Sequence, residues 1–348
     1  MKIGVVTIYN SLNSGSYLQA LSLCEFLKKE GYDSGLVRNR MYRKNRFGYR
    51  FLLFSKYVFL GRFKRASYII RTYAGLVKSR SKYRYIDQRK ADICVFGSDT
   101  IWNVAEEYFG KEWKHYFGAG YAGKKIAYAP SLGPTEANVI RMNEKLKKCI
   151  AEFDAIGVRD RHTYAAVSAI LPDREVALVV DPTMLMDKSF FEQLAYPCTD
   201  EKFILFYSFG RIEPKMFSRI QSFAKEQGLK LICMGENVGS CDKYLPRTPL
   251  LMMGYFSKAD YVITDTYHGS VFSIIFKKRF TCIDCGKSKV NDLLERFGLM
   301  NRIARTADDM DVIFRETIDF DSVDKILDRM RKTSKEFLLR ALRKCEED

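Results

Sequence analysis

The sequence predicts an α/β protein of two doubly wound domains that face each other across a cleft. Short apolar runs alternate with segments of helical periodicity along most of the 348 residues, and this alternation indicates parallel sheets with helices on both faces. The length exceeds that of one compact domain, so two are expected. We place the first over residues 1–185 and the second over 186–348, with Pro182 and Pro197 bracketing the connection.

The first domain opens on a strand over residues 2–8. A helix over 17–30 follows, because leucine and phenylalanine recur there at helical spacing and Gly31 ends the pattern. Helices are also expected over 136–152 and 161–171. Four-to-five-residue apolar runs predict the remaining strands, over 33–37, 92–96, 125–129, 155–158 and 176–180.

The second domain repeats the alternation. Its strands are expected over 203–208, 230–234, 261–264 and 279–283. Its helices are expected over 214–227, 249–259 and 269–276. The chain then ends in one long charged helix over 321–346, which is long enough to cross back onto the first domain.

The positive charge of the chain is confined to one segment. Residues 38–90 hold 17 lysines and arginines and one acid, which equals the formal net charge of +16 of the whole chain. Twelve aromatic residues interleave with these bases, and we expect a mainly helical insertion in the first domain. The pattern suits an anionic membrane surface or a lipid-linked substrate, and also a solvated helical hairpin. Nucleic acid is not expected as a partner, since no nucleic-acid motif accompanies the segment.

Composition excludes several other classes of protein. No apolar run reaches the roughly 20 residues that span a bilayer, and the first residues read as a strand rather than a signal peptide. The nine cysteines are scattered and fit reduced thiols in a cytoplasmic protein. Cys282 and Cys285 form a single CxxC with no second pair, so no metal is expected. We therefore expect a cytoplasmic protein, which the basic segment would hold at the inner face of the plasma membrane if that segment binds anionic lipid.

The segment YVITDTYHGSVFSIIF, residues 261–276, is the most informative. It predicts a buried strand, a polar turn and an apolar helix whose first amide N–H groups favour an anion. His268 adds an imidazole, a side chain that can act as a general acid or base. The alternative is a polar helix cap with a hydrogen-bonded histidine. The other candidate binding residues of this turn are Thr266, Tyr267, Gly269 and Ser270.

Polar turns also follow two strands of the first domain. In residues 10–16, small residues allow a ligand close to the backbone, and the candidates are Asn13, Ser14 and Gly15. Arg159 stands at a strand end, where its forked guanidinium suits a carboxylate or phosphate. The alternative for the first turn is a bare loop. The other two histidines, at 115 and 162, are expected to be structural or exposed.

A third turn reads FGSDTIWN over residues 96–103. Gly97 allows a tight turn after a buried strand, and Ser98 follows it. Asp99 suits sugar hydroxyls, and Trp102 suits stacking on a sugar ring. The alternative is an N-cap at Asp99 and a buried tryptophan.

Together these turns resemble the polysaccharide pyruvyl transferase family. The matching segments are NSLNSGSYLQAL, GSDTIWN, GVRD, VVDPTML and ADYVITDTYHGSVFSIIF, and they span nearly the whole chain. The resemblance implies a fold like that of the GT-B glycosyltransferases. It implies transfer of pyruvate from phosphoenolpyruvate to a sugar of a cell-surface or capsular polysaccharide precursor, which gives a cyclic ketal.

The resemblance also implies residue roles. His268 matches the family's histidine and would be the general acid/base, and Arg159 matches the arginine that holds the phosphoenolpyruvate anion. Thr266 and Ser16 depart from the pattern, since some relatives carry arginine and aspartate there. Phosphoenolpyruvate is the donor substrate, no cofactor is expected, and the acceptor is a glycan or lipid-linked sugar. Asp99 is assigned to the acceptor hydroxyl.

Two other functions remain open from the sequence. One is a glycosyltransferase of the same architecture that uses a nucleotide sugar. The other is a non-catalytic glycan-binding relative, which the threonine at position 266 suggests.

Overall fold

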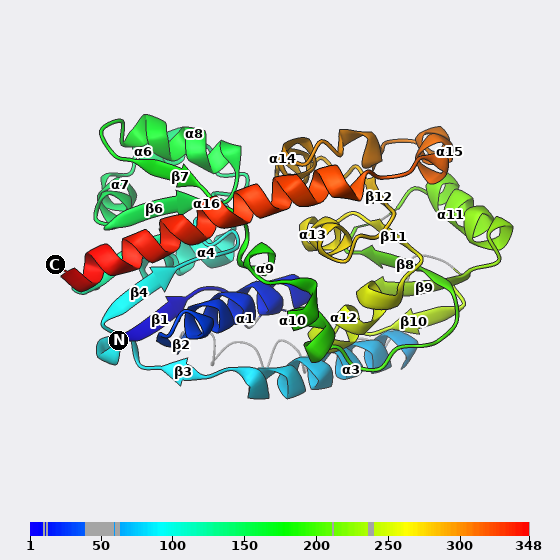
Figure 1. Cartoon of the computed structure of the whole chain (residues 1–348), viewed down its shortest axis with the longest axis horizontal. Coiled ribbons are helices and arrows are strands. Elements are labelled where there is room, and N and C mark those ends of the chain that lie inside the picture. The colour runs from blue at the N-terminus through cyan, green and yellow to red at the C-terminus, as the bar shows by residue number, and fades with distance from the viewer. Residues whose placement is uncertain are drawn as a thin grey trace. The chain divides into compact units, whose positions relative to one another are not determined.

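The computed structural model describes residues 1–9, 11, 13–38, 59, 63–210, 212–235 and 240–347 (Figure 1). The chain divides into two compact units. Unit 1 comprises Met1–Tyr49, Arg80–Met186 and Asp328–Asp348. Unit 2 comprises Arg50–Ser79 and Asp187–Leu327. Part of the basic segment, residues 39–58 and 60–62, lies outside the described residues, so its predicted helical insertion stays a prediction there.

Unit 1 is built on a sheet of seven parallel strands in the order β3-β2-β1-β4-β5-β6-β7. The strands are β1 (Lys2–Val6), β2 (Asp33–Val37), β3 (Tyr85–Ile86), β4 (Ile93–Phe96), β5 (Lys124–Tyr128), β6 (Ala155–Val158) and β7 (Val176–Leu178). The helices are α1 (Ser14–Lys29), α4 (Glu107–Lys111), α5 (Trp113–Tyr116), α6 (Ala137–Arg141), α7 (Glu144–Ala151), α8 (Arg161–Ile170) and α9 (Pro182–Leu185).

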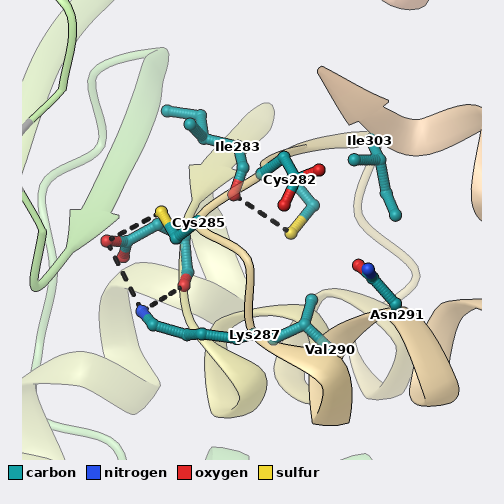
Figure 2. Close-up of a pocket in the computed structure, with 9 residues that line it drawn as sticks. Cys282, Ile283, Cys285, Lys287, Val290, Asn291 and Ile303 are labelled. Carbon is teal, nitrogen blue, oxygen red and sulfur yellow. Dashed lines mark hydrogen bonds and ion pairs between the residues drawn. The ribbon is translucent and has the colours of Figure 1, made fainter. Parts of the chain in front are cut away.

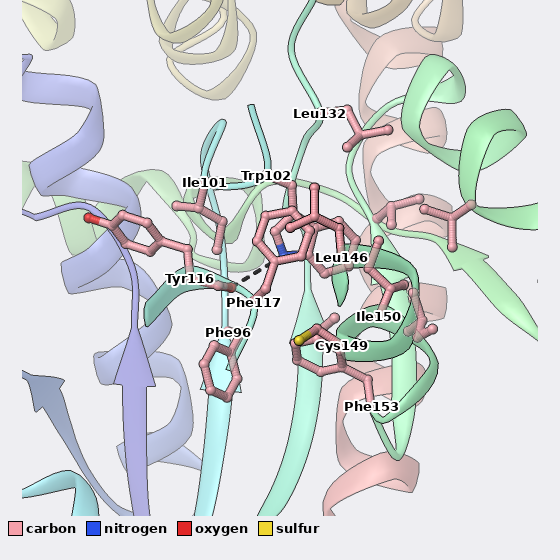
Figure 3. Packing of buried hydrophobic residues seen from close by; sticks show 14 of the residues in the cluster. Phe96, Ile101, Trp102, Tyr116, Phe117, Leu132, Leu146, Cys149, Ile150 and Phe153 are labelled. Carbon is pink, nitrogen blue, oxygen red and sulfur yellow. Dashed lines mark hydrogen bonds between the residues drawn. The ribbon is translucent and has the colours of Figure 1, made fainter. Parts of the chain in front are cut away.

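The core of unit 1 gathers around Trp102, which is fully buried. Its ring stacks on Phe117 at 5.5 Å between ring centroids and lies 5.7 Å from Phe153 (Figure 3). Phe96 of β4 meets Phe153 edge to face at 5.2 Å. Such aromatic pairs stabilise a core beyond the area that they bury. The central strands are continuous apolar runs because both faces of a parallel sheet are covered.

Unit 2 contains six parallel strands in the order β10-β9-β8-β11-β12-β13. The strands are β8 (Phe203–Ser208), β9 (Lys230–Gly235), β10 (Lys243–Leu245), β11 (Tyr261–Thr264), β12 (Phe280–Ile283) and β13 (Ile303–Ala304). The helices are α3 (Phe63–Ser79), α10 (Lys188–Leu194), α11 (Pro214–Glu226), α12 (Pro249–Lys258), α13 (Tyr267–Ile275), α14 (Ser288–Arg296) and α15 (Ala307–Arg315).

Strand order positions the candidate turns in each unit. Both sheets are doubly wound, and the order reverses between β1 and β4 in unit 1 and between β8 and β11 in unit 2. Ligands of open α/β sheets bind at such a reversal, outside the carboxyl ends of the strands. The turns after β1 and β4 hold the first-domain candidates other than Arg159, which follows β6, and the turn after β11 holds His268.

The predicted fold class is confirmed, and several element boundaries differ. The expected helix over 136–152 is two helices, because Asn143 caps a new helix with its side chain on the amides of Lys145 and Leu146. The helix predicted from residue 17 already begins at Ser14. Strands β3, β10 and β13 were not predicted, since runs of two or three residues carry no readable periodicity.

The state of the cysteines is a correction. Cys233 and Cys241 form a disulfide with their Cα atoms 6.2 Å apart, whereas the sequence predicted reduced thiols throughout. The pairing was hidden because Cys233 sits inside an apolar strand and Cys241 lies beyond it. Among the described residues, no helix combines the length and the apolar character needed to cross a bilayer.

The terminal helix α16 (Phe320–Glu347) contributes residues to both units. In unit 1, Ser334 Oγ accepts a hydrogen bond from the Val180 amide at 2.9 Å. Phe337 is buried, and its ring lies over Gly157 of β6, where a Cβ atom would come within 2.5 Å of it. The expected domain boundary kept the whole tail in the second domain, whereas this packing explains why the last residues group with unit 1.

We predict that Phe337→Ala lowers the free energy of unfolding of unit 1 by about 3 kcal/mol, because it leaves a cavity over Gly157. Urea unfolding followed by tryptophan fluorescence checks this, since both tryptophans, at 102 and 113, belong to unit 1. Lys332→Ala, at an exposed position of the same helix, is the matched control. Equal midpoints for the two variants would contradict the docking of α16.

Candidate functional site

The turn after β11 is built around the start of α13. Thr266 caps the helix, and its Oγ1 accepts a hydrogen bond from the Gly269 amide at 2.9 Å. Thr264 Oγ1 lies 3.0 Å from Thr266 Oγ1. A Cβ atom at position 269 would stand 2.1 Å from Thr264 Oγ1, so only glycine fits there. Both threonine hydroxyls therefore make their hydrogen bonds within the turn and fix its shape.

His268 occupies the first turn of α13 and is 5% exposed. The ring of Tyr267 meets its imidazole edge to face at 5.3 Å, and Phe272 lies at 6.5 Å on the same helix. Ser270 donates its hydroxyl back to the Thr266 carbonyl at 3.2 Å, which is a helix-internal bond. The structure therefore holds the imidazole in a fixed, mostly dry position beside a helix N-terminus.

Asp265 links the turns that follow β8 and β11, the two central strands of unit 2. Its carboxylate is 2% exposed and accepts hydrogen bonds from the amides of Phe209 at 3.0 Å and Gly210 at 2.7 Å, both after β8. The sequence analysis did not select Asp265. The signal was present, because an aspartate directly after a buried strand can reach the backbone of the neighbouring turn.

Asp265, Cys285 and Lys287 line one small pocket. Figure 2 labels Cys285 and Lys287 in this pocket. Lys287 Nζ donates to the Asp265 carbonyl at 2.9 Å and lies 3.8 Å from its carboxylate. Burial and then the neighbouring Asp265 raise the pKa of the Cys285 thiol, so it stays protonated and is a poor nucleophile. No cluster of metal ligands occurs in the part of the chain that the structure describes.

A second cluster of charged groups occupies the carboxyl edge of the sheet in unit 1. Arg159 is 1% exposed, and its Nη1 lies 2.9 Å from Asp181 Oδ2. Its Nη2 lies 4.0 Å from Asp99 Oδ1. Ser98 donates to Asp181 Oδ2 at 3.1 Å, and Ser16 donates to Asp99 Oδ2 at 2.6 Å. The cluster brings together three of the candidate residues, Ser98, Asp99 and Arg159.

The surroundings of Arg159 differ from those of an open anion clamp. Its guanidinium is buried with a carboxylate on either side, and an ionised pair at such depth is held by mutual hydrogen bonding. Asp181 is the partner that the sequence analysis missed, because the segment VVDPTML was interpreted only as an exit from the domain. Arg159 therefore holds the carboxylates of Asp99 and Asp181 in place.

Gly97 shapes the turn after β4. Its φ is +136°, and a Cβ atom there would lie 1.8 Å from the Tyr128 carbonyl oxygen. The backbone of β5 therefore approaches this turn as closely as a glycine allows. Asp99 follows with φ 72°, a conformation in which aspartate is tolerated.

Two sequence predictions for unit 1 need correction. Trp102 is fully buried and donates its Nε1–H to the Tyr116 carbonyl at 3.3 Å (Figure 3), so it packs the core and offers no face to a sugar. In the first turn, Asn13 caps α1 by accepting from the Gly15 amide at 2.9 Å, and Ser14 is buried. Residues 10 and 12 of that turn lie outside the described residues.

The remaining histidines have structural surroundings. Burial lowers the pKa of His115 to about 4, which keeps it neutral at physiological pH. His162 Nε2 lies 3.0 Å from the Thr135 carbonyl oxygen. Of the three histidines in the sequence, His268 is the one that stands at a strand-order reversal.

A comparison with known protein families finds a match over most of the chain. The polysaccharide pyruvyl transferase family matches residues 13–287, which include both clusters. The chain belongs to this family. The matched region begins at the cap of α1 and ends at Lys287, after β12, so the clusters in both units fall inside it. No curated protein sequence matches this pyruvyl transferase family member.

Solved structures show the likeness of fold. A UDP-GlcNAc 2-epimerase from Neisseria meningitidis bound to UDP-GlcNAc matches with TM-score 0.54 and 11% identity, covering 98% of this chain and 100% of that one. Another UDP-N-acetylglucosamine 2-epimerase matches with TM-score 0.54 and 9% identity over 97% and 95% of the two chains. A protein from Listeria monocytogenes matches with TM-score 0.50 and 10% identity over 95% and 90%. At these identities the likeness concerns the fold alone.

We predict that Asp181→Asn destabilises unit 1 by about 3 kcal/mol, because it leaves the Arg159 charge buried without its carboxylate. Tryptophan fluorescence during urea unfolding measures this loss. Asp173→Asn, at an exposed position of the same unit, is the control and should stay near wild type. A loss below about 1 kcal/mol for Asp181→Asn, the range of an exposed pair, would show that the pair does not hold the cluster.

Proposed function

We propose that this protein transfers pyruvate from phosphoenolpyruvate to a sugar of a cell-surface or capsular polysaccharide precursor and so forms a cyclic ketal. The family membership supports the reaction class. The observation that carries the assignment is His268, an imidazole held at the start of α13 where the strand order of unit 2 reverses. Neither other histidine has a comparable setting.

The chemistry requires a proton donor and acceptor. Protonation of the methylene carbon of phosphoenolpyruvate gives a centre with oxocarbenium character, and a sugar hydroxyl adds to it with loss of its proton. The bond to phosphate then breaks and inorganic phosphate leaves. A second sugar hydroxyl closes the ketal, and its proton passes to the departing phosphate. His268 delivers the proton to carbon and removes a hydroxyl proton, a role that suits an imidazole near neutral pH.

In this proposal, Asp99 binds the acceptor sugar. The hydroxyl of Ser16 at 2.6 Å and the guanidinium of Arg159 at 4.0 Å hold its carboxylate in place, and a fixed carboxylate can accept a hydrogen bond from a sugar hydroxyl. Arg159, buried beside Asp99 and Asp181, acts as a positioning residue for the Asp99 carboxylate. The amide N–H groups at the start of α13 add a favourable field for negative charge.

We predict that His268→Ala lowers ketal formation by about a hundredfold or more, the usual effect of losing a general acid/base. Phosphate release from phosphoenolpyruvate, measured with a panel of glycan acceptors, checks this. His162→Ala is the control, since that histidine meets only a backbone carbonyl in the described contacts. Near wild-type turnover by His268→Ala would remove His268 from the mechanism.

A thermal-shift panel separates the donor classes. Stabilisation by phosphoenolpyruvate supports the proposal. Stabilisation by nucleotide sugars, without an effect of phosphoenolpyruvate, would favour a glycosyltransferase of the same fold. Binding of glycans with no donor effect would indicate a non-catalytic relative.

We also propose that the segment over residues 38–90 holds the enzyme at an anionic membrane surface, near a lipid-linked acceptor. The support is its charge of 17 bases against one acid, since each base near such a surface contributes about 1 kcal/mol. We expect a variant with half of these bases changed to glutamine to lose co-sedimentation with anionic vesicles. Equal co-sedimentation of variant and wild type would contradict the proposal.

A further inference from the structure

Unit 2 buries a group of hydrogen-bonding atoms that have no partner in the part of the chain that the structure describes. They are the hydroxyls of Tyr68, Thr72 and Tyr207 and the Nε and Nη1 atoms of Arg247. A buried polar atom without a partner costs about 1–3 kcal/mol. Several such atoms in one place call for an explanation, and a bound ligand is one that would satisfy them together.

Helix α3 brings two of these hydroxyls to the segment that carries Arg247. Tyr68, Thr72 and Gly75 are spaced four and three residues apart, so they share one face of the helix. At Gly75 a Cβ atom would lie 2.2 Å from Thr248 Cγ2, which shows that this face packs directly against the residue after Arg247. Thr72 and Leu76 on the same helix are buried as well.

The ring of Phe209 contacts both Arg247 and Tyr207. The guanidinium carbon of Arg247 lies 4.1 Å from the centre of the Phe209 ring, and the rings of Tyr207 and Phe209 pack edge to face at 5.5 Å. Burial raises the pKa of Tyr207, with the Arg247 charge acting in the opposite direction. The Tyr207 hydroxyl is therefore a neutral donor within the field of a cation.

The group borders the turn that carries His268. Tyr207 pairs with Thr264 in the register of β8 and β11, and the Phe209 amide donates to Asp265. Arg247 comes after β10, and Asp265 and His268 come after β11. All of these residues lie at the carboxyl edge of the same parallel sheet, within unit 2.

The chemistry of the group favours an anion. Arg247 makes no ion pair with a described carboxylate, and Asp265 is already bonded to two backbone amides. A guanidinium and three hydroxyls can all donate hydrogen bonds, and a guanidinium fork matches the oxygens of a phosphate. Water would satisfy the hydroxyls and leave the half-buried charge without a counter-ion.

We propose that Arg247, Tyr207, Tyr68 and Thr72 form a phosphate-binding subsite of unit 2. The proposal rests on the proposed function only for the identity of the phosphate, which is then that of phosphoenolpyruvate. The cation of this subsite comes from the loop after β10, in the same unit as His268.

Isothermal titration calorimetry of the full chain with inorganic phosphate, phosphoenolpyruvate and pyruvate tests the subsite. We expect Arg247→Met to weaken binding of inorganic phosphate and of phosphoenolpyruvate by about tenfold to a hundredfold, the loss of a charge-assisted hydrogen bond. Pyruvate, which offers only a carboxylate, should bind both proteins alike. Arg315→Met, an exposed arginine of the same unit, is the matched control.

A second variant keeps the test valid if Arg247→Met folds poorly. Tyr207→Phe removes a hydroxyl that has no partner, so the variant should unfold at the wild-type urea concentration or higher and still bind inorganic phosphate at least threefold more weakly. A structural role of the hydroxyl predicts the reverse, a less stable protein with unchanged binding, and that result would overturn the proposal.

The remaining outcomes separate this inference from the proposed reaction. If Arg247→Met leaves phosphate binding unchanged, or weakens pyruvate binding alone, the phosphate subsite is wrong. If inorganic phosphate binds in an Arg247-dependent way and phosphoenolpyruvate gives no turnover with any glycan, the subsite stands and the proposed function falls. Arg247→Lys should recover part of the affinity, because it restores the charge without the fork.

Discussion

Every strand of both sheets runs parallel to its neighbours, and this single constraint decides where polar side chains gather. Parallel strands need crossover helices, which cover both faces of the sheet and leave apolar side chains along the strands. Hydrogen-bonding and charged groups are then left to the strand ends. In unit 1 this edge carries Asp99, Arg159 and Asp181, and in unit 2 it carries Asp265 and His268.

The carboxyl edges of the two sheets stabilise their buried charged side chains in different ways. Unit 1 pairs its arginine with a carboxylate at 2.9 Å and surrounds both with serine and threonine hydroxyls. Unit 2 satisfies Asp265 with backbone amides and leaves Arg247 stacked on Phe209 without a carboxylate. The first arrangement pairs its arginine with a buried carboxylate, whereas the second leaves the Arg247 guanidinium without a carboxylate among the described residues.

The turns themselves depend on glycines that no other residue replaces. Gly97 has the Tyr128 carbonyl where a Cβ atom would be, and Gly269 has the hydroxyls of two threonines there. Gly97 lets the backbone of the neighbouring strand β5 approach its turn, and Gly269 lets the side chains of Thr264 and Thr266 fold against the start of α13. The position of Asp99 in unit 1, and of His268 in unit 2, follows from these close approaches.

The sequence by itself determined the fold class, most strands and the family. Continuous apolar runs and helical periodicity are local patterns, and the strands over 155–158, 203–208 and 261–264 match the predictions at both ends. Likewise, a histidine between a buried strand and an apolar helix identified the turn at His268. The short strands β3, β10 and β13 were not predicted, because they depend on pairing with a neighbouring strand rather than on a pattern of their own residues.

Only the tertiary structure decided which side chains meet. Trp102 and Asp99 stand three residues apart in one polar-looking turn, and the packing sends the ring into the core and keeps the carboxylate at the sheet edge. Asp181 and Arg247 became visible only as partners of Arg159 and Phe209, which are distant in the sequence. Contacts of this kind depend on side-chain direction and burial, because a linear pattern records spacing along the chain and not proximity across a sheet.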